Sequence, residues 1–134
     1  MPKTFEISIK VRFADIDKFN HVNNAKFLTY IEEARMQYFD HFAPDNNWKE
    51  TGIILANAQL SFLKPIFGSD QVTVKVWCSR VGNKSFDLSY EVFKKSSKSE
   101  RVELCSTAMT SIVCYNYLEE RTISIPGHWK TFLS

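Results

Sequence analysis

The segment of residues 13–24, FADIDKFNHVNN, concentrates polar side chains of the kinds that carry out chemistry. It contains two aspartates and a histidine, followed by two adjacent asparagines: Asp15, Asp17, His21, Asn23 and Asn24. A carboxylate can attack a carbonyl carbon directly, or it can activate a water molecule as a general base. If a helix begins where this segment ends, its free N–H groups can hold the oxyanion that such an attack creates. One short loop could therefore supply both halves of an acyl-transfer site.

A purely structural interpretation of the same residues is also open. Asparagine is a favoured cap at the start of a helix because its side-chain oxygen accepts a hydrogen bond from an unpaired backbone N–H. An aspartate nearby suits the positive end of the helix dipole. On this interpretation Asp15, Asp17, Asn23 and Asn24 only form the turn between a strand and a helix, which is the commoner use of such residues.

The elements that must position these residues are a strand before the segment and a helix after it. Residues 5–13 alternate between apolar and polar side chains, which predicts a half-buried strand. Residues 23–42 change to a helical period, with a broad apolar face and a narrower polar stripe. Such a face predicts a long helix that is covered on more than one side. The segment APDNNWKETG, rich in turn residues, ends it.

The rest of the chain is strand-like. Four runs rich in β-branched and aromatic residues are separated by short turn segments: residues 53–65, 71–81, 86–94 and 102–115. Short connections predict antiparallel neighbours, and the unusual length of two runs predicts a strongly curved sheet. Trp129, Phe132 and Leu133 predict a short docked segment at the C-terminus. The layout is α+β, a curved antiparallel sheet of about five strands wrapped round one long central helix, which is called a hotdog.

Length and composition restrict the class of protein. The 134 residues predict one domain, 1–134, and an apolar content of 44% predicts a packed core. A net charge of +2 is too small to indicate a nucleic-acid partner. The first residues contain no long apolar run, so neither a signal peptide nor a membrane partner is expected. Three cysteines at spacings typical of neither a zinc site nor a redox pair indicate reduced, buried thiols and a cytoplasmic location.

A specific resemblance joins these observations. Residues 15–35, DIDKFNHVNNAKFLTYIEEAR, resemble the motif D-x-D-x-x-G-H-V-N-N-x-x-Y-x-x-Y-x-E-x-A-R of the 4-hydroxybenzoyl-CoA thioesterase family, whose members are hotdog acyl-CoA thioesterases. The KSF of residues 84–86 and the TISIP of residues 122–126 are similar to the family as well. The resemblance implies that Asp17 is the catalytic carboxylate, as nucleophile or as general base, and that the Asn24 backbone amide polarises the thioester carbonyl.

The resemblance also bears on the neighbouring positions. His21 and Asn23 occupy motif positions that shape the loop, either directly in catalysis or through hydrogen bonding and capping. Asp15 is expected to hold the turn, and Glu32 with Arg35 to form an ion pair or a dimer contact. Two positions depart from the motif. Asn20 replaces the usual glycine, and asparagine tolerates a positive φ, so the turn is expected to form. Phe27 replaces the commoner tyrosine and removes its hydroxyl group. These two departures leave the substrate preference open.

Coenzyme A carries phosphates, so basic side chains should lie at the entrance of the site. By their positions in the family, Lys84 and Arg121 are the candidates for this contact. A second group of cations, in the segment of residues 94–101, is expected to form a solvated hairpin tip. The apolar residues Leu55, Ala58 and Phe62 would either line an acyl tunnel or belong to the core.

The function that follows is hydrolysis of an acyl-CoA to a free acid and CoA, with no cofactor and no metal. The resemblance further implies a homodimer or homotetramer with the site between two subunits. Two alternatives remain: hydrolysis of acyl groups carried by acyl carrier protein, which is acidic and would favour a basic rim, and a non-catalytic acyl-binding module. A hotdog dehydratase is disfavoured because the only histidine of the predicted helix, His41, lies near its far end.

Overall fold

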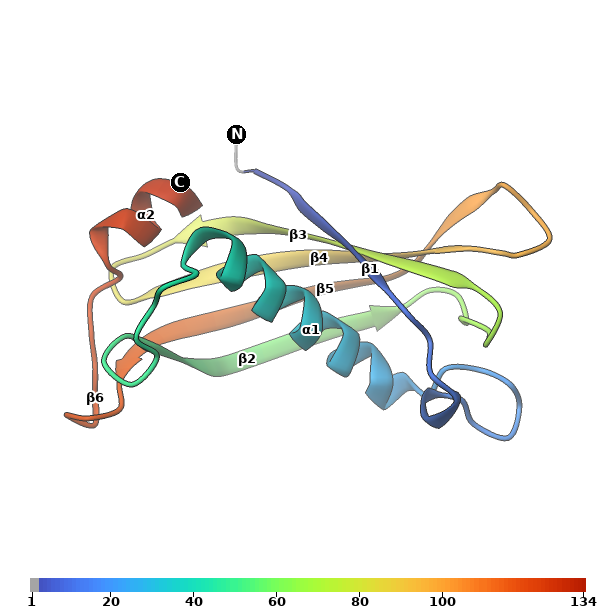
Figure 1. Ribbon diagram of the computed structural model, residues 1–134, viewed down its shortest axis with the longest axis horizontal. Helices are drawn as coiled ribbons and strands as arrows, with labels where there is room; N and C mark the ends of the chain where they lie inside the picture. Colours follow the sequence, from blue (N-terminus) through green and yellow to red (C-terminus); the bar gives the residue numbers. More distant parts are fainter. Residues whose placement is uncertain (1–2) are drawn as a thin grey trace.

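The computed structural model describes residues 3–134, which form one curved sheet and a long helix (Figure 1). The strands are β1 (Phe5–Ile9), β2 (Gly52–Phe62), β3 (Gln71–Val81), β4 (Ser85–Lys95), β5 (Val102–Asn116) and the two-residue β6 (Arg121–Thr122). The helices are α1 (Asn24–Phe42) and α2 (Gly127–Leu133), and a 3-10 turn, η1 (Phe13–Asp15), lies between β1 and α1. The α+β layout expected from the sequence is confirmed.

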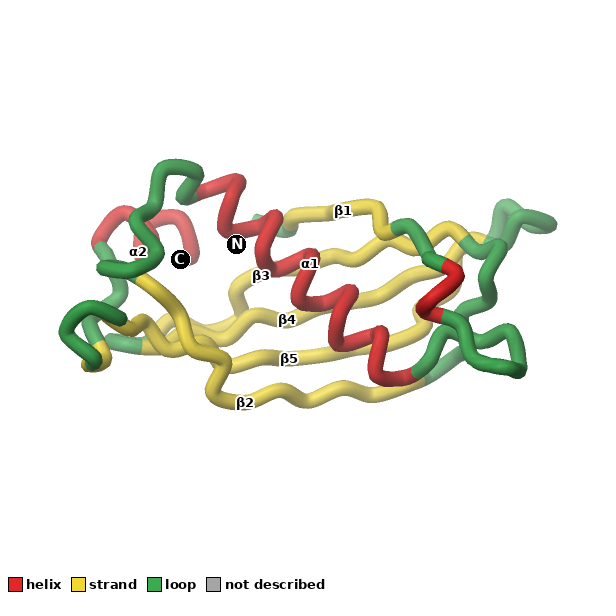
Figure 2. Tube along the Cα trace, turned by 60° about the horizontal axis from the view of Figure 1, so that its bottom comes forward, coloured by secondary structure: helices red, strands yellow, loops and turns green. Residues whose placement is uncertain are grey.

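The strands are antiparallel in the order β1-β3-β4-β5-β2, with β6 paired to the end of β5. Helix α1 crosses one face of this sheet diagonally, as Figure 2 shows, and packs on β1 and β3. Strand β2, which follows the helix in sequence, is the last strand in this order and pairs with β5, so it forms an edge of the sheet that residues 3–134 build. The start of α1 and the end of β2 lie at the same end of the molecule, on the right in Figure 1.

The core lies between α1 and the sheet. Alternate residues of β3 and β4 point toward the helix and are buried: Val72, Val74, Val76, Cys78, Phe86, Leu88, Tyr90 and Val92. The helix contributes Phe27, Tyr30, Ile31, Ala34, Arg35, Tyr38 and Phe39. The apolar faces that the sequence predicted from a period of 2 in the strands and 3.6 in the helix are the faces that pack together. Leu28, on the flank of the helix, stays 40% exposed.

The C-terminal segment docks as predicted. It forms α2, in which Trp129 and Leu133 are buried. The ring of Phe132 stacks on that of Phe42 at the end of α1, with centroids 4.6 Å apart. The aromatic residues therefore close the end of the core that lies opposite the start of α1 (Figure 1).

The first strand is shorter than the sequence pattern predicted. The pattern extended it to Phe13, but β1 ends at Ile9 and Phe13 begins the 3-10 turn with a side chain that is 96% exposed. The cause is a local hydrogen bond: the backbone N–H of Arg12 donates to the carboxylate of Asp15 at 2.9 Å, which turns the chain out of the sheet. The next strand ends at Phe62, before the predicted end at residue 65.

The cysteines are buried and unpaired, as expected: Cys78, Cys105 and Cys114. Burial raises the pKa of the Cys105 and Cys114 thiols to about 11, so both stay protonated at neutral pH. Within residues 3–134, no helix combines the length and the apolar character that crossing a bilayer requires.

Candidate active site

The loop between β1 and α1 is anchored by Asp15. Its carboxylate is fully buried and accepts hydrogen bonds from the Tyr30 hydroxyl at 2.8 Å, from the Arg12 backbone N–H and from the Arg12 guanidinium. Burial alone would raise the pKa of Asp15, but these donors outweigh it and hold the pKa below its usual value. Asp15 therefore holds the turn in its ionised form, the role expected from the sequence.

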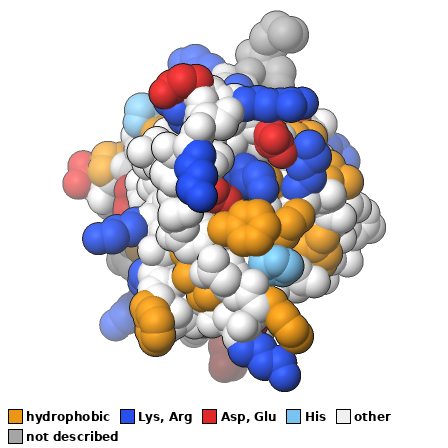
Figure 3. Space-filling model, turned by 90° about the vertical axis from the view of Figure 1, so that its right-hand side faces the viewer, with side chains coloured by type: hydrophobic (Ala, Val, Ile, Leu, Met, Phe, Trp, Pro, Cys, Tyr) orange, Lys and Arg blue, Asp and Glu red, His pale blue; other side chains and the backbone are white. Residues whose placement is uncertain are grey.

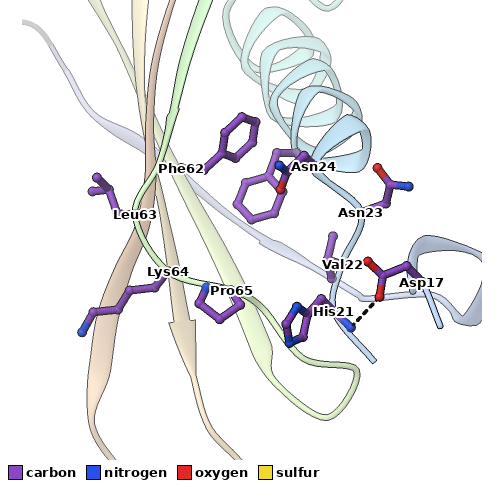
Figure 4. Close-up of a pocket in the computed structure, with 10 residues that line it drawn as sticks. Asp17, His21, Val22, Asn23, Asn24, Phe62, Leu63, Lys64 and Pro65 are labelled. Atoms are coloured by element: carbon purple, nitrogen blue, oxygen red, sulfur yellow. Dashed lines mark hydrogen bonds between the residues drawn. The ribbon is translucent and has the colours of Figure 1, made fainter. Parts of the chain in front are cut away.

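Asp17 lies in the next part of the loop, with one oxygen fixed and the other free. Its Oδ1 accepts a hydrogen bond from the backbone N–H of Phe19 at 2.9 Å. It accepts a second from the backbone N–H of His21 at 3.2 Å, which Figure 4 shows as a dashed line. Its Oδ2 accepts no hydrogen bond from the described residues and is not buried, so it remains available to a ligand. The loop turns at Asn20, whose φ of 64° confirms that asparagine occupies the glycine-like conformation.

The start of α1 supplies the second element of the site. The Asn23 side chain caps the helix by accepting a hydrogen bond from the Ala25 N–H at 3.0 Å, so the capping interpretation of this residue holds. Asn24 is the first helical residue, and its N–H donates no hydrogen bond within the described part of the chain. A free N–H at the positive end of a 19-residue helix is a suitable donor for an oxyanion.

These two elements face one pocket of about 450 Å³. Asp17, His21, Val22, Asn23, Asn24 and Phe27 come from the loop and α1, and Phe62, Leu63, Lys64 and Pro65 come from the end of β2 and the segment after it (Figure 4). The His21 ring contacts the Phe67 ring edge to face, with ring centroids 5.0 Å apart. The His21 backbone N–H donates to the Asp17 carboxylate. The four predicted catalytic residues are thus brought together around one cavity. A carboxylate and a free helix N–H in one cavity are the two groups that acyl transfer needs.

The wall formed by residues 62–65 was predicted only in part. Phe62 was expected to line an acyl tunnel or to belong to the core, and it lines the pocket, whereas Leu63, Lys64 and Pro65 were not expected there. The wall reaches the loop because the Val22 N–H donates to the Ile66 carbonyl oxygen at 2.8 Å and His21 forms a β-bridge with Phe67. The ammonium group of Lys94 fixes it further, since it donates to the Pro65 carbonyl oxygen at 2.6 Å. Lys94 was expected at a solvated hairpin tip, but these long-range contacts make it a support of the pocket wall.

The two cations expected at coenzyme A lie elsewhere. Lys84 follows β3 and Arg121 lies in β6, where the Lys84 ammonium approaches the Thr122 hydroxyl at 3.5 Å. This is the end of the sheet opposite the pocket (Figure 1), so one chain does not bring them to Asp17. At the pocket itself, Lys64 lines the wall and forms a 3.0 Å ion pair with Glu103.

The end of the molecule that carries the pocket is mixed in character. Figure 3 shows Lys and Arg side chains spread over this end, with hydrophobic side chains between them. Two of the hydrophobic side chains are unusually exposed, Phe13 at 96% and Phe19 at 68%. Across residues 3–134, no group of three or more His, Cys, Asp and Glu side chains has a geometry suited to a metal ion.

Comparison with known proteins places the chain in a class. The solved structure of a 4-hydroxybenzoyl-CoA thioesterase mutant in complex with 4-hydroxybenzoyl-CoA superimposes with a TM-score of 0.86 over 98% of this chain and 99% of that chain, at 18% identity. The fold is therefore that of the hotdog thioesterases. A sequence profile of the Thioesterase-like superfamily matches residues 11–133. The chain belongs to this superfamily and is a thioester hydrolase.

Two relatives share parts of this sequence. The long-chain acyl-CoA thioesterase FadM of Escherichia coli (strain K12) is 23% identical over 125 residues, which cover 91% of each chain. YsmA of Bacillus subtilis (strain 168) is 31% identical over 87 residues, which cover 65% of this chain and 59% of YsmA. The similarity to FadM extends over nearly the whole length of both proteins.

Proposed function

We propose that the protein hydrolyses the thioester bond of an acyl-CoA, with Asp17 as the catalytic carboxylate. The observation that carries the proposal is the shared pocket, which both Asp17 and Asn24 line. Among residues 3–134, neither the Oδ2 atom of Asp17 nor the N–H of Asn24 has a hydrogen-bond partner. The family and the similarity to FadM support acyl-CoA as the substrate class.

The reaction needs little beyond these groups. As a general base, Asp17 takes a proton from water while the water oxygen bonds to the thioester carbon, and the Asn24 N–H holds the resulting oxyanion. The C–S bond then breaks and the CoA thiolate recovers the proton from Asp17. As a nucleophile, Asp17 would instead displace CoA to form a mixed anhydride, which water hydrolyses. Neither route requires a metal or an organic cofactor.

Residues His21 and Asn23 act through the positions of their neighbours. The His21 N–H fixes the Asp17 carboxylate, and the Asn23 cap fixes the first turn of α1 and with it the Asn24 N–H. Coenzyme A would leave the pocket past Lys64. Lys84 and Arg121 of a second subunit remain the proposed contacts for its phosphates, because in one chain they lie at the far end of the sheet.

A homodimer would bring that second subunit to the pocket. Within residues 3–134, strand β2 pairs on one side only, and its edge carries apolar side chains that are open to solvent: Ile54 at 38% and Leu55 at 41%, followed by Leu63 at 54%. An exposed, long and apolar edge strand is a surface that proteins cover. Antiparallel pairing of β2 with its copy would place the opposite end of one sheet beside the pocket of the other. A closed two-fold assembly is the simplest outcome, and a tetramer would add to it.

One alternative substrate has an observation in its favour. The Lys and Arg side chains at the pocket end, together with the exposed Phe13 and Phe19, would suit an acidic acyl carrier protein. An acyl carrier protein would contact a larger surface of this protein than coenzyme A, which would contact only the residues at the mouth of the pocket. Double substitution of Phe13 and Phe19 by serine should therefore raise KM for an acyl carrier protein thioester and leave that for the acyl-CoA unchanged.

The decisive experiment is a thiol-release assay with a panel of acyl-CoAs, run in parallel on the Asp17→Asn variant. Asparagine keeps an oxygen that accepts from the Phe19 and His21 N–H groups, so the loop should stay folded. We expect kcat to fall by about 10² to 10⁴. Turnover that survives in Asp17→Asn would refute the assignment of Asp17, and acyl-CoA binding without turnover in both proteins would instead support a non-catalytic module.

A further inference from the structure

Two phenylalanine rings from different elements meet at the inner end of the pocket. Phe27 comes from α1 and Phe62 is the last residue of β2, and both line the cavity. Their ring centroids are 5.2 Å apart and their planes are 81° apart, which is the edge-to-face contact that aromatic pairs prefer. The pair therefore connects the helix to the edge strand, and Figure 4 shows the Phe62 ring pointing toward the start of the helix.

The position of Phe27 on the helix sets the depth of the pocket. It follows Asn24 by three residues, which corresponds to about 4.5 Å along the helix axis. Helical side chains lean toward the N-terminus, so the Phe27 ring lies still closer to the Asn24 N–H. An acyl group whose carbonyl oxygen accepts from this N–H would thus meet the aromatic pair less than one helical turn along the helix axis from the reacting carbon.

The two rings differ in how tightly the surrounding residues pack against them. Phe27 is only 2% exposed and also packs near Tyr30, with ring centroids 6.5 Å apart, so it forms a fixed wall. Phe62 is 47% exposed in the chain and is held on fewer sides. Removing the Phe62 ring should therefore open the inner end of the pocket without disturbing the core, whereas removing Phe27 would leave a cavity in the core.

We propose that the Phe27–Phe62 pair restricts the substrate to a compact acyl group, either a single aromatic ring or a chain of a few carbons. This inference rests on the proposed hydrolysis of an acyl-CoA and names its substrate class. Val22 and Pro65 add apolar side chains to the lining, beside the polar residues of the loop. An aromatic acyl group would find ring edges and faces to contact, and a long fatty chain would be stopped by the pair.

The test compares benzoyl-CoA, butanoyl-CoA and hexadecanoyl-CoA, the last kept below its micelle concentration. For the wild type we expect kcat/KM for the two compact substrates to exceed that for hexadecanoyl-CoA by about 10-fold or more. The Phe62→Ala variant should lose at least about 10-fold of this preference, mainly through faster turnover of hexadecanoyl-CoA. Met36→Ala is the matched control, because Met36 is 41% exposed on α1, close to the 47% of Phe62, and lies outside the pocket lining.

Binding by calorimetry separates this inference from the proposed chemistry. It is measured for the same three ligands in the Asp17→Asn background, with and without Phe62→Ala, so that selection is tested whether or not the wild type turns them over. Tighter binding of benzoyl-CoA than of hexadecanoyl-CoA, reversed or abolished by Phe62→Ala, would support the pair as the selecting element. The inference would be overturned if the protein preferred hexadecanoyl-CoA or bound none of the three ligands. It would also be overturned if Phe62→Ala left the relative affinities unchanged. Absent turnover alone would count against Asp17 chemistry only.

Discussion

The hydroxyl group of Tyr30 donates a 2.8 Å hydrogen bond to the buried carboxylate of Asp15. Tyr30 lies in the second turn of α1 and Asp15 ends the 3-10 turn that precedes the Asp17 loop. The Asn23 N–H also donates to the Asp15 carbonyl oxygen, at 2.9 Å. The helix start and the loop are thus tied together through Asp15, and the separation between Asp17 and the Asn24 N–H depends on this contact.

Replacing Tyr30 by phenylalanine should destabilise the fold in a pH-dependent way. At neutral pH the lost hydrogen bond to an ionised group should lower the free energy of unfolding by about 2 kcal/mol. The donors hold the pKa of Asp15 below its usual value, so their contribution is present above the unfolded pKa of about 4 and is lost as the pH falls through the folded pKa. Urea unfolding at about pH 7 and about pH 3 should show the difference between the two proteins shrinking in acid.

Tyr117→Phe provides the control for that measurement. The Tyr117 hydroxyl donates a hydrogen bond of the same 2.8 Å length, but to the backbone carbonyl oxygen of Ile53, which does not titrate. Its loss should lower the free energy of unfolding equally at both pH values. If Tyr30→Phe were equally insensitive to pH, the ionised state of Asp15 would not be what this contact stabilises.

Asn20 should tolerate glycine and resist alanine. Its φ of 64° is a conformation that costs residues with a Cβ about 1 kcal/mol or more, and asparagine and glycine are the residues that adopt it most readily. We expect Asn20→Ala to lower the free energy of unfolding by about 1 kcal/mol and to reduce kcat/KM, because the Asn20 N–H donates to the Asp17 carbonyl oxygen at 3.0 Å. Thermal unfolding and thiol release measure the two effects.

Asn20→Gly is the control variant for Asn20→Ala, and we expect its stability and activity to be close to those of the wild type. Both variants remove the same side-chain amide, so a loss confined to alanine would be caused by the backbone conformation. Equal losses in the two variants would show instead that the Asn20 side chain has a role of its own.

Local sequence patterns predicted the helices and strands well where residues close in sequence determine the structure. The strand over residues 71–81 has the predicted bounds, and α1 begins one residue after the expected start because Asn23 caps it. The prediction went wrong at Phe13. Alternation alone continues the strand through this residue, whereas the hydrogen bonds to Asp15 from Arg12 turn the chain away earlier.

The candidate site was predictable only on one side. Asp17 through Asn24 lie in one continuous loop, so their proximity follows from sequence. The facing wall depends on contacts between residues about forty positions apart, such as Val22 with Ile66, and no local period reveals them. Of this wall, the sequence pointed only to Phe62, as a residue of an acyl tunnel or of the core. The distance of Lys84 and Arg121 from the pocket likewise reflects the length of the sheet, which motif positions do not encode.

The Asn24 N–H can be deleted without deleting the helix. Asn24 is the first helical residue, a position that favours proline, and Asn23 before it has a ψ of 136°, which a following proline requires. We expect Asn24→Pro to fold with near-normal stability and to lose about 10² to 10³ in kcat, because it lacks the donor for the oxyanion. Thiol-release kinetics measure the loss, and thermal unfolding monitors the fold.

Asn24→Ala separates the backbone from the side chain. Alanine keeps the N–H and removes the amide group, so its kcat should stay within a few-fold of the wild-type value. If Asn24→Ala lost as much activity as Asn24→Pro, the side chain and not the backbone would be the functional group at this position. If Asn24→Pro kept full activity, the oxyanion would be held elsewhere.

A single charge on the β2 edge should test the proposed dimer. Leu55 is 41% exposed on this edge, so Leu55→Lys should cost an isolated chain little but should oppose pairing with a second copy. Light scattering should give twice the 15.6 kDa chain mass for the wild type and the single mass for the variant, and thiol release should fall in parallel. Val102→Lys is the control, because Val102 is 60% exposed at the start of β5. It lies beyond the end of the β2–β5 pairing, which stops at Phe62 and Ser106, so the variant should leave mass and activity unchanged. A wild type that stays a single chain and yet turns over acyl-CoA would show that one subunit holds the complete site.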